Sequence, residues 1–337
     1  MKSESYYGGF YWVAITSFIV PLFVAYAAFN KLTPTTKPTP APDASGVDNN
    51  LWDYLLRNHV DNGLVDYSGM AKDYLFTTYL RQLAGADPSK LKTRGEQLAL
   101  HCNAYNALVI NGVIKHKIHL NEQNVLEYAP KDVAANVERL DKEIEMLKRT
   151  PNSDPLAIAE LMQKADSLRT QTQFFNIQEH VFANQTISLD HLEHKIIRPV
   201  FQEPRIHVAL VCAAKSCPAI RGEAYLGDRL ELQLEDQAKQ FANNPTYVDY
   251  DPVADIVRLS PIVNWYSEDW NASGGYLKWL SERVSSEAAR EKLLAADAQK
   301  IKVAFNSYDW SLNSQSGSGS KGSSKSGGFG SGSVPNE

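Results

Sequence analysis

The stretch Arg205-Ile-His-Val-Ala-Leu-Val-Cys-Ala-Ala-Lys-Ser-Cys-Pro218 decides how this chain is interpreted, because it combines an apolar run with reactive side chains. Residues 205–212 are rich in Val, Ile and Leu, which predicts a buried central strand. On a period of two, His207 and Cys212 would face opposite sides of that strand. The loop after it is the kind of place where folds present reactive groups.

Cys217 directly precedes Pro218, an order that suits a helix N-cap followed by proline at the first helical position. A thiol at a helix N-terminus has a lowered pKa and is a better nucleophile, and Lys215 would lower that pKa further. Three interpretations stay open. Cys217 is a nucleophile, or it forms a disulfide with Cys212 in an exported domain, or it is inert packing.

Two other predicted helices place polar side chains among apolar ones. In residues 96–117, Asn106 lies in or beside the apolar arc, and Asn103 lies at its flank. A buried amide must be hydrogen-bonded, because an unpaired one costs about 1–3 kcal/mol. Each amide therefore either caps a neighbouring loop or supports a catalytic group.

In the helix predicted over residues 188–200, Glu193 lies on the apolar face and His194 at its edge. A carboxylate on such a face needs a partner, since otherwise it becomes protonated. The candidate partners are His194, His207, Arg198 and Arg205. Glu193 would thus form a structural ion pair, or it would orient an imidazole beside a nucleophile.

The composition limits the class of protein. The 337 residues allow one large domain or two small ones, and 43% hydrophobic with 22% charged residues is ordinary globular usage. The net charge of −5 argues against a broad nucleic-acid surface. Three cysteines exclude a disulfide scaffold and an all-cysteine zinc site, and a mixed site of His194, His207, Cys212 and Cys217 lacks finger or ribbon spacing. We expect no metal or cofactor.

The two ends of the chain differ from the middle. Residues 1–30 hold an uncharged apolar run long enough to span a membrane, so they are a signal peptide cleaved after Ala27 or an uncleaved anchor. Residues 31–50 are a Pro-rich linker, and residues 314–337 are a disordered Ser/Gly-rich tail. The globular domain, residues 51–313, would be membrane-anchored or secreted, and would touch the membrane only if the segment stays uncleaved.

The domain itself is predicted to be a single α+β or irregular α/β domain, helix-rich around a small mixed sheet, with a papain-like or permuted papain-like fold as one candidate. A turn is expected at Asn62-Gly63, and a strand-turn-strand unit over 247–260. Residues 133–172, broken by Pro151 and Pro155, predict a charged helical hairpin, an insertion that would shape access to a cleft or bind a partner. The remaining helices are expected from residue 51, and over 74–83, 226–243 and 277–302.

Several motifs resemble the DUF547 domain family of uncharacterised proteins. They are Asn103-Ala-Tyr-Asn-Ala107, Ser188-Leu-Asp-His-Leu-Glu-His-Lys-Ile-Ile-Arg198, residues 204–218, and Ala224-Tyr225. Weaker similarities lie at Val65-Asp-Tyr67, at residues 259–266 with Asp269, and at residues 308–313. His101 and Cys102 stand where the family has an aromatic and an aliphatic residue, so neither is taken as a family site residue. The resemblance implies a family more than an activity.

The residues favour a cysteine-dependent acyl-transfer hydrolase that acts on an amide or thioester-like bond. Cys217 would attack, His194 or His207 would accept its proton, and Glu193 would orient that imidazole. The supporting residues would be Asn103, Asn106, Arg198, Cys212 and Ser216, which precedes Cys217. The alternative is a non-catalytic exported binding or structural module with a Cys212–Cys217 disulfide, and in either case the protein partner or peptide-like substrate stays open.

Every histidine of the chain precedes Cys217. The order of nucleophile and base found in papain is therefore excluded for this cysteine. A papain-like site would have to be permuted, with its histidine before its cysteine, and geometry rather than chain order identifies such sites.

Overall fold

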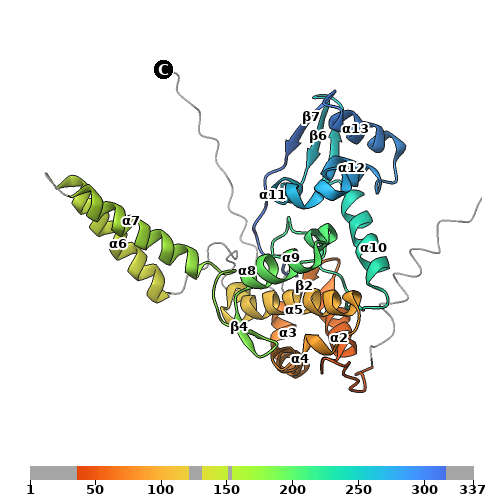
Figure 1. The fold of residues 1–337 in the computed structure, drawn as a ribbon, viewed down its shortest axis with the longest axis horizontal. Helices are drawn as coiled ribbons and strands as arrows, with labels where there is room; N and C mark the ends of the chain where they lie inside the picture. Colours follow the sequence, from red (N-terminus) through yellow and green to blue (C-terminus); the bar gives the residue numbers. More distant parts are fainter. Residues whose placement is uncertain (1–35, 121–130, 151–153, 316–337) are drawn as a thin grey trace, which may run out of the picture. The chain divides into compact units, whose positions relative to one another are not determined.

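The computed structural model describes residues 36–120, 131–150 and 154–315. It confirms the predicted α+β class, with many helices and small sheets (Figure 1). All elements below belong to the unit Pro38–Glu337. The predicted signal or anchor segment, residues 1–30, lies outside the described residues. Within those residues, no helix is long and apolar enough to cross a membrane.

Helix α5 (Arg94–Lys115) lies at the centre of the larger hydrophobic core. A reciprocal capping box between Thr93 and Glu96 starts it. Its side chains are buried on every side from Leu98 to Ile110, although the sequence pattern predicted a single buried arc. Figure 1 shows α2, α3 and α4 packed along it. These helices are α2 (Asn49–His59), α3 (Tyr67–Lys72) and α4 (Tyr74–Ala84).

The hairpin of β1 (Val60–Asp61) and β2 (Leu64–Val65) confirms the predicted turn. Asn62 and Gly63 both have positive φ, 51° and 79°, as a type I′ turn requires. Gly63 is also confined by space, since a Cβ there would lie 2.5 Å from the Cβ of Ala219. The turn therefore holds residues 60–65 against the loop that follows the two cysteines.

The charged helical hairpin is also present. Helices α6 (Lys131–Arg149) and α7 (Pro155–Thr172) lie side by side, as Figure 1 shows. They share a small core of Leu140, Ile144 and Ala165. A hairpin with its own apolar core needs few contacts with the rest of the domain. That it shapes access to a cleft or binds a partner stays a prediction.

A second core lies around the largest sheet, in which β5 (Val248–Asp251) and β6 (Ile256–Leu259) confirm the strand-turn-strand unit predicted over 247–260 and pair antiparallel. The third strand, β7 (Lys302–Phe305), runs parallel to β6 and was not predicted. The helices that pack on this sheet are α10 (Leu230–Ala242), α12 (Tyr276–Ser281) and α13 (Glu287–Asp297). A smaller antiparallel pair consists of β3 (His180–Phe182) and β4 (Gln185–Ile187).

The predicted central strand over residues 205–212 is wrong. Glu203 accepts a hydrogen bond from the N–H of Arg205 and, with Pro204, starts the 3-10 helix η4 (Pro204–Val208), after which the chain is an irregular buried loop. The Asn106 side chain pairs with this loop in place of a neighbouring strand. An apolar run signals burial, but it does not distinguish a strand from a loop whose backbone is satisfied by side chains.

The predicted N-cap role of Cys217 is also wrong. The N–H of Cys217 closes a turn onto the carbonyl of Ala214, and the next helix after Cys217 begins only at Leu230. The short elements that remain are η1 (Pro88–Lys90), η2 (Ile118–Leu120), α8 (Leu189–His191), η3 (Leu192–Ile197), α9 (Arg198–Phe201), α11 (Ile262–Trp265) and η5 (Ser267–Ser273).

The last described residues, 306–315, return to the cysteine loop. Ala214 forms an antiparallel bridge with Leu312, and Val65 a parallel bridge with Ser314. The Tyr67 hydroxyl donates to the Asn313 side chain at 2.6 Å. The C-terminal segment thereby joins the β1–β2 hairpin to the loop that holds the two thiols.

Candidate functional site

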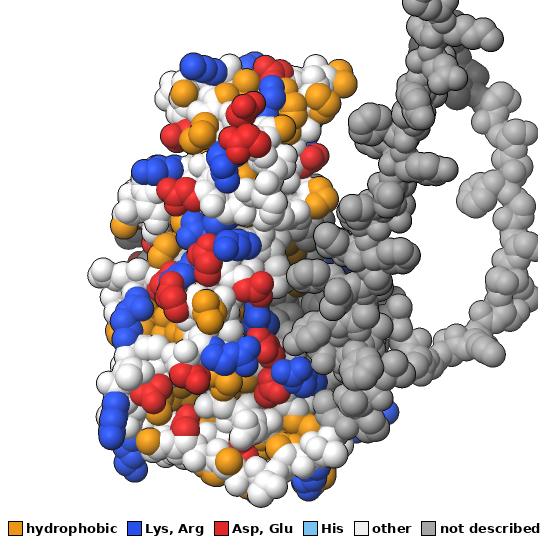
Figure 2. All heavy atoms as spheres, turned by 90° about the vertical axis from the view of Figure 1, so that its right-hand side faces the viewer, with side chains coloured by type: hydrophobic (Ala, Val, Ile, Leu, Met, Phe, Trp, Pro, Cys, Tyr) orange, Lys and Arg blue, Asp and Glu red, His pale blue; other side chains and the backbone are white. Residues whose placement is uncertain are grey.

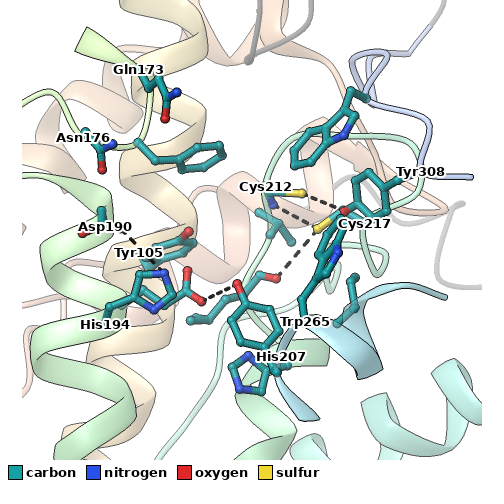
Figure 3. Close-up of a pocket in the computed structure, with 17 residues that line it drawn as sticks. Tyr105, Gln173, Asn176, Asp190, His194, His207, Cys212, Cys217, Trp265 and Tyr308 are labelled. Carbon is teal, nitrogen blue, oxygen red and sulfur yellow. Dashed lines mark hydrogen bonds and ion pairs between the residues drawn. The ribbon is translucent and has the colours of Figure 1, made fainter. Parts of the chain in front are cut away.

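A cavity of about 360 Å³ brings most of the predicted site residues together. Its walls come from α5, residues 173–176, the η3 turn, the loop through the cysteines, α11 and the C-terminal segment. Figure 3 shows the sulfurs and Tyr308 on one side of the cavity and His194 on the other. Predicted residues in the lining are Cys212, Cys217, His194, His207 and Glu193.

Cys212 and Cys217 meet at the cavity wall, and both are free thiols. The N–H of Cys212 donates to the sulfur of Cys217 at 3.0 Å. The sulfur of Cys212 lies 3.1 Å from the Tyr308 hydroxyl. Cys217 is only 5% exposed, whereas Cys212 is partly exposed. Cys212 is thus the thiol that a ligand in the cavity would meet.

The surroundings of the pair favour the thiolate form of Cys212. A hydrogen bond from Cys217 lowers the pKa of the Cys212 thiol, and the Tyr308 hydroxyl and the N–H of Ala214 act in the same direction. Burial raises the pKa of Cys217, which is therefore the member that keeps its proton. Ala213 has a φ of 63°, unusual for a residue with a Cβ, and sits in the turn that brings the Ala214 N–H to the sulfur.

Neither imidazole is hydrogen-bonded to a sulfur among the described residues. The Nη1 of Arg198 donates to Nδ1 of His194 at 3.0 Å, so this nitrogen carries no proton and the neutral ring is protonated at Nε2. The Nε2 of His207 lies 2.7 Å from Asp269, and the ring stacks on Tyr266 with centroids 3.8 Å apart. The histidines therefore line the cavity without forming the expected pair with a thiol.

Asp269 links the two histidines through Arg198. The Arg198 guanidinium donates to both carboxylate oxygens, at 2.8 and 2.9 Å. Hydrogen bonds from His207 and Arg198 hold the pKa of Asp269 well below its usual range. Burial lowers the pKa of His207, so its ring is neutral near pH 7. This network supports the Tyr266 ring from behind.

Glu193 faces hydroxyl groups rather than an imidazole. The Tyr266 hydroxyl donates to its Oε1 at 3.1 Å, and burial together with the same carboxylate raises the pKa of Tyr105 on α5. Glu193 lies in the π-helical turn η3, in which the Arg198 N–H bonds the Glu193 carbonyl five residues earlier. Pro199 has no N–H for the regular ladder, and π turns occur often at functional sites.

The two asparagines clamp loops of the site. Asn106 accepts from the Val211 N–H and donates to the Ala209 carbonyl, both at 3.0 Å. Asn103 pairs in the same way with the N–H and carbonyl of Tyr225, at 2.9 and 2.8 Å. These contacts correspond to the loop-capping alternative, and they make Asn106 a positioning residue for Cys212.

Ser216 fastens the C-terminal segment instead of lining the cavity. Its Oγ accepts from the Asp309 N–H at 2.8 Å, and its own N–H donates to the Asp309 carbonyl. Lys215 adds a backbone hydrogen bond to the Ser311 carbonyl at 2.8 Å. These bonds place Tyr308 against the thiols.

Sequence reasoning did not select the aromatic residues of the site. Trp265, Tyr308 and Trp310 form a cluster with ring centroids 4.6 to 6.1 Å apart. Tyr266 donates a hydrogen bond to Glu193, and Tyr105 lines the same cavity. The available signal was the aromatic density of residues 308–310 just before the Ser/Gly tail, but only the fold joins them to residue 212.

Tyr308→Phe is expected to raise the pKa of the Cys212 thiol, because it removes a hydroxyl donor from the sulfur and keeps the ring. We expect a shift of about one pKa unit, which is tenfold less thiolate well below the midpoint. The measurement is the alkylation rate of Cys212 against pH. An unchanged midpoint would show that Tyr308 does not stabilise the thiolate. Tyr250→Phe, whose hydroxyl bonds Asp255 at the surface, is the control.

A family model described as "Protein of unknown function, DUF547" matches residues 88–242. This range contains both cysteines, both asparagines, Glu193 and the two histidines. It excludes all three strands of the largest sheet, Tyr266, Asp269 and the aromatic segment 308–310. The comparisons with curated proteins and with solved structures found no match.

Proposed function

Because residues 88–242 belong to the DUF547 family, whose description states no function, we propose from the site that this chain is a cysteine hydrolase. It would cleave an amide or thioester bond through an acyl-enzyme. The nucleophile is Cys212, a change from the Cys217 that the sequence favoured. One observation carries the proposal: Cys212 lines the cavity with its sulfur 3.1 Å from the Tyr308 hydroxyl, and Cys217, Tyr308 and Ala214 lower the pKa of its thiol.

A thiolate that is already stabilised needs no imidazole to remove its proton. This fits an arrangement in which His207 is bound to Asp269 and His194 to Arg198. The Nε2–H of His194 would donate to bound substrate across the cavity. In the structure, this nitrogen lies 3.7 Å from Oδ1 of Asp190.

The reaction would proceed in two steps. The Cys212 thiolate forms a bond to the carbonyl carbon, and the bond to the leaving group breaks as that group takes the proton of Cys217. A water molecule then attacks the thioester carbon, Glu193 accepts a proton from it, and Cys212 leaves as the thiolate. That proton returns to Cys217 through solvent, so the net reaction consumes one water.

Acyl-enzyme trapping tests this proposal. The folded chain is mixed with a panel of aryl and alkyl thioesters, quenched in acid within seconds and digested for peptide mass spectrometry. We expect one acyl group per chain, on Cys212. Acylation on Cys217 alone would return the nucleophile to the residue that the sequence favoured, and labelling of surface lysines only would contradict the hydrolase.

A further inference from the structure

The cavity lining carries acidic side chains without basic ones among the described residues, whereas the outer surface carries both. Figure 2 shows acidic and basic side chains interspersed over the face it presents. The cavity lining contains the carboxylates of Asp190 and Glu193 but no lysine or arginine among its described residues. The nearby guanidinium of Arg198 is held by Asp269 outside this lining and stacks on the Tyr266 ring, 5.0 Å from its centroid.

Other groups engage both histidines of the lining. His207 is buried, burial lowers its pKa, and its Nε2 lies 2.7 Å from Asp269. Nδ1 of His194 accepts a hydrogen bond from Arg198, and its Nε2 lies 3.7 Å from Asp190. With Cys212 as a thiolate, the cavity would carry still more negative charge. An anionic substrate would therefore be repelled by the carboxylates of the lining.

The aromatic cluster beside the thiols is the second feature of the cavity that bears on its ligand. Trp265 is 49% exposed and packs with Tyr308 and Trp310 at the cavity wall. Large exposed aromatic surface in a cavity is available for stacking or for cation–π contact. The Tyr308 hydroxyl touches the Cys212 sulfur, so a group held on these rings lies beside the reacting atom.

We propose that the substrate of this site carries a cationic group, an ammonium or guanidinium, held between the carboxylates and the aromatic cluster. The proposal rests on the proposed function, since it names the substrate class of the same site. The carboxylates would supply charge, and the rings would supply contact with a weakly hydrated cation. An amine or guanidine near the scissile bond, as in a peptide with a basic side chain, has this chemistry.

The test compares the alkylation of Cys212 by cationic 2-bromoethylamine, neutral iodoacetamide and anionic iodoacetate. Each forms a thioether as the halide leaves, so Cys217 cannot reverse the label. Rates at Cys212, mapped by peptide, are divided by those of the urea-unfolded chain. We expect a normalised rate at least about tenfold higher for the cation than for the anion, falling as salt rises.

Two variants locate the effect. The double variant Asp190→Asn and Glu193→Gln should reduce the cation-to-anion ratio to near one, while Asp249→Asn, an exposed carboxylate outside the cavity, should leave it unchanged. Equal normalised rates, or a faster anion, would overturn the cation site. A clear preference for the cation without any acyl-enzyme would instead overturn the hydrolase alone, so the two failures are distinguishable.

Discussion

Cys212→Ser is expected to lower the kcat/KM for a thioester by about 10³-fold or more, because a serine hydroxyl in this position has no base to activate it. Cys217→Ser keeps a hydroxyl donor near the Cys212 sulfur, so we expect a loss of only about tenfold. Its pH–rate profile should keep nearly the same midpoint, because a serine hydroxyl donates hydrogen bonds at least as well as a thiol.

Cys102→Ala is the matched control for these variants. Cys102 is fully buried in α5, burial raises its pKa, and it does not line the cavity. Rates within about twofold of the parent protein are expected for it. If Cys217→Ser were the variant that lost 10³-fold while Cys212→Ser stayed active, the assignment of the two thiols would be reversed.

Asn106→Ala is expected to have the largest effect on stability. It leaves the buried N–H of Val211 and the carbonyl of Ala209 without their partners. Each unpaired buried group costs about 1–3 kcal/mol, so the free energy of unfolding should fall by about 2–5 kcal/mol. Urea unfolding followed by far-UV circular dichroism measures this change.

The same variant separates a positioning role from a purely structural one. Residues 209–211 lead directly to Cys212, so the folded Asn106→Ala protein should show a Cys212 alkylation midpoint closer to that of a free thiol. Asn271→Ala, an exposed position, should change stability by less than about 0.5 kcal/mol. A destabilised variant with an unchanged midpoint would show that the clamp serves only the fold.

Local signals predicted the local structure well. A helix was expected from residue 51, and α2 begins at Asn49 with Asp48 as its cap. The Asn62-Gly63 dipeptide makes the β1–β2 turn, and the charged segment folds as a helical hairpin. The cap and the turn depend on residues a few positions away, and each helix of the hairpin follows from its own local sequence pattern. The strand β7 forms only by pairing in parallel with β6, which lies more than 40 residues earlier in the chain. No local sequence pattern predicts such a pairing.

The site shows the same division. Its polar residues could be found because they break an apolar pattern, as Glu193 and Asn106 do. Their partners could not, because Glu193 binds Tyr266 and Asn106 binds a loop about 100 residues away. The prediction of a strand over residues 205–212 was wrong for this reason. The predicted burial of this segment is correct, but the Asn106 side chain supplies hydrogen bonds that a neighbouring strand would have supplied.

The rate of alkylation of each cysteine against pH, measured without reductant on the folded chain, decides which thiol is the nucleophile. Iodoacetamide should label Cys212 first, with a midpoint well below about 8.5, the ordinary thiol value, and Cys217 far more slowly. Labelling of Cys217 first, or recovery of Cys212 and Cys217 as one disulfide-linked peptide from the native protein, would contradict the assignment of Cys212.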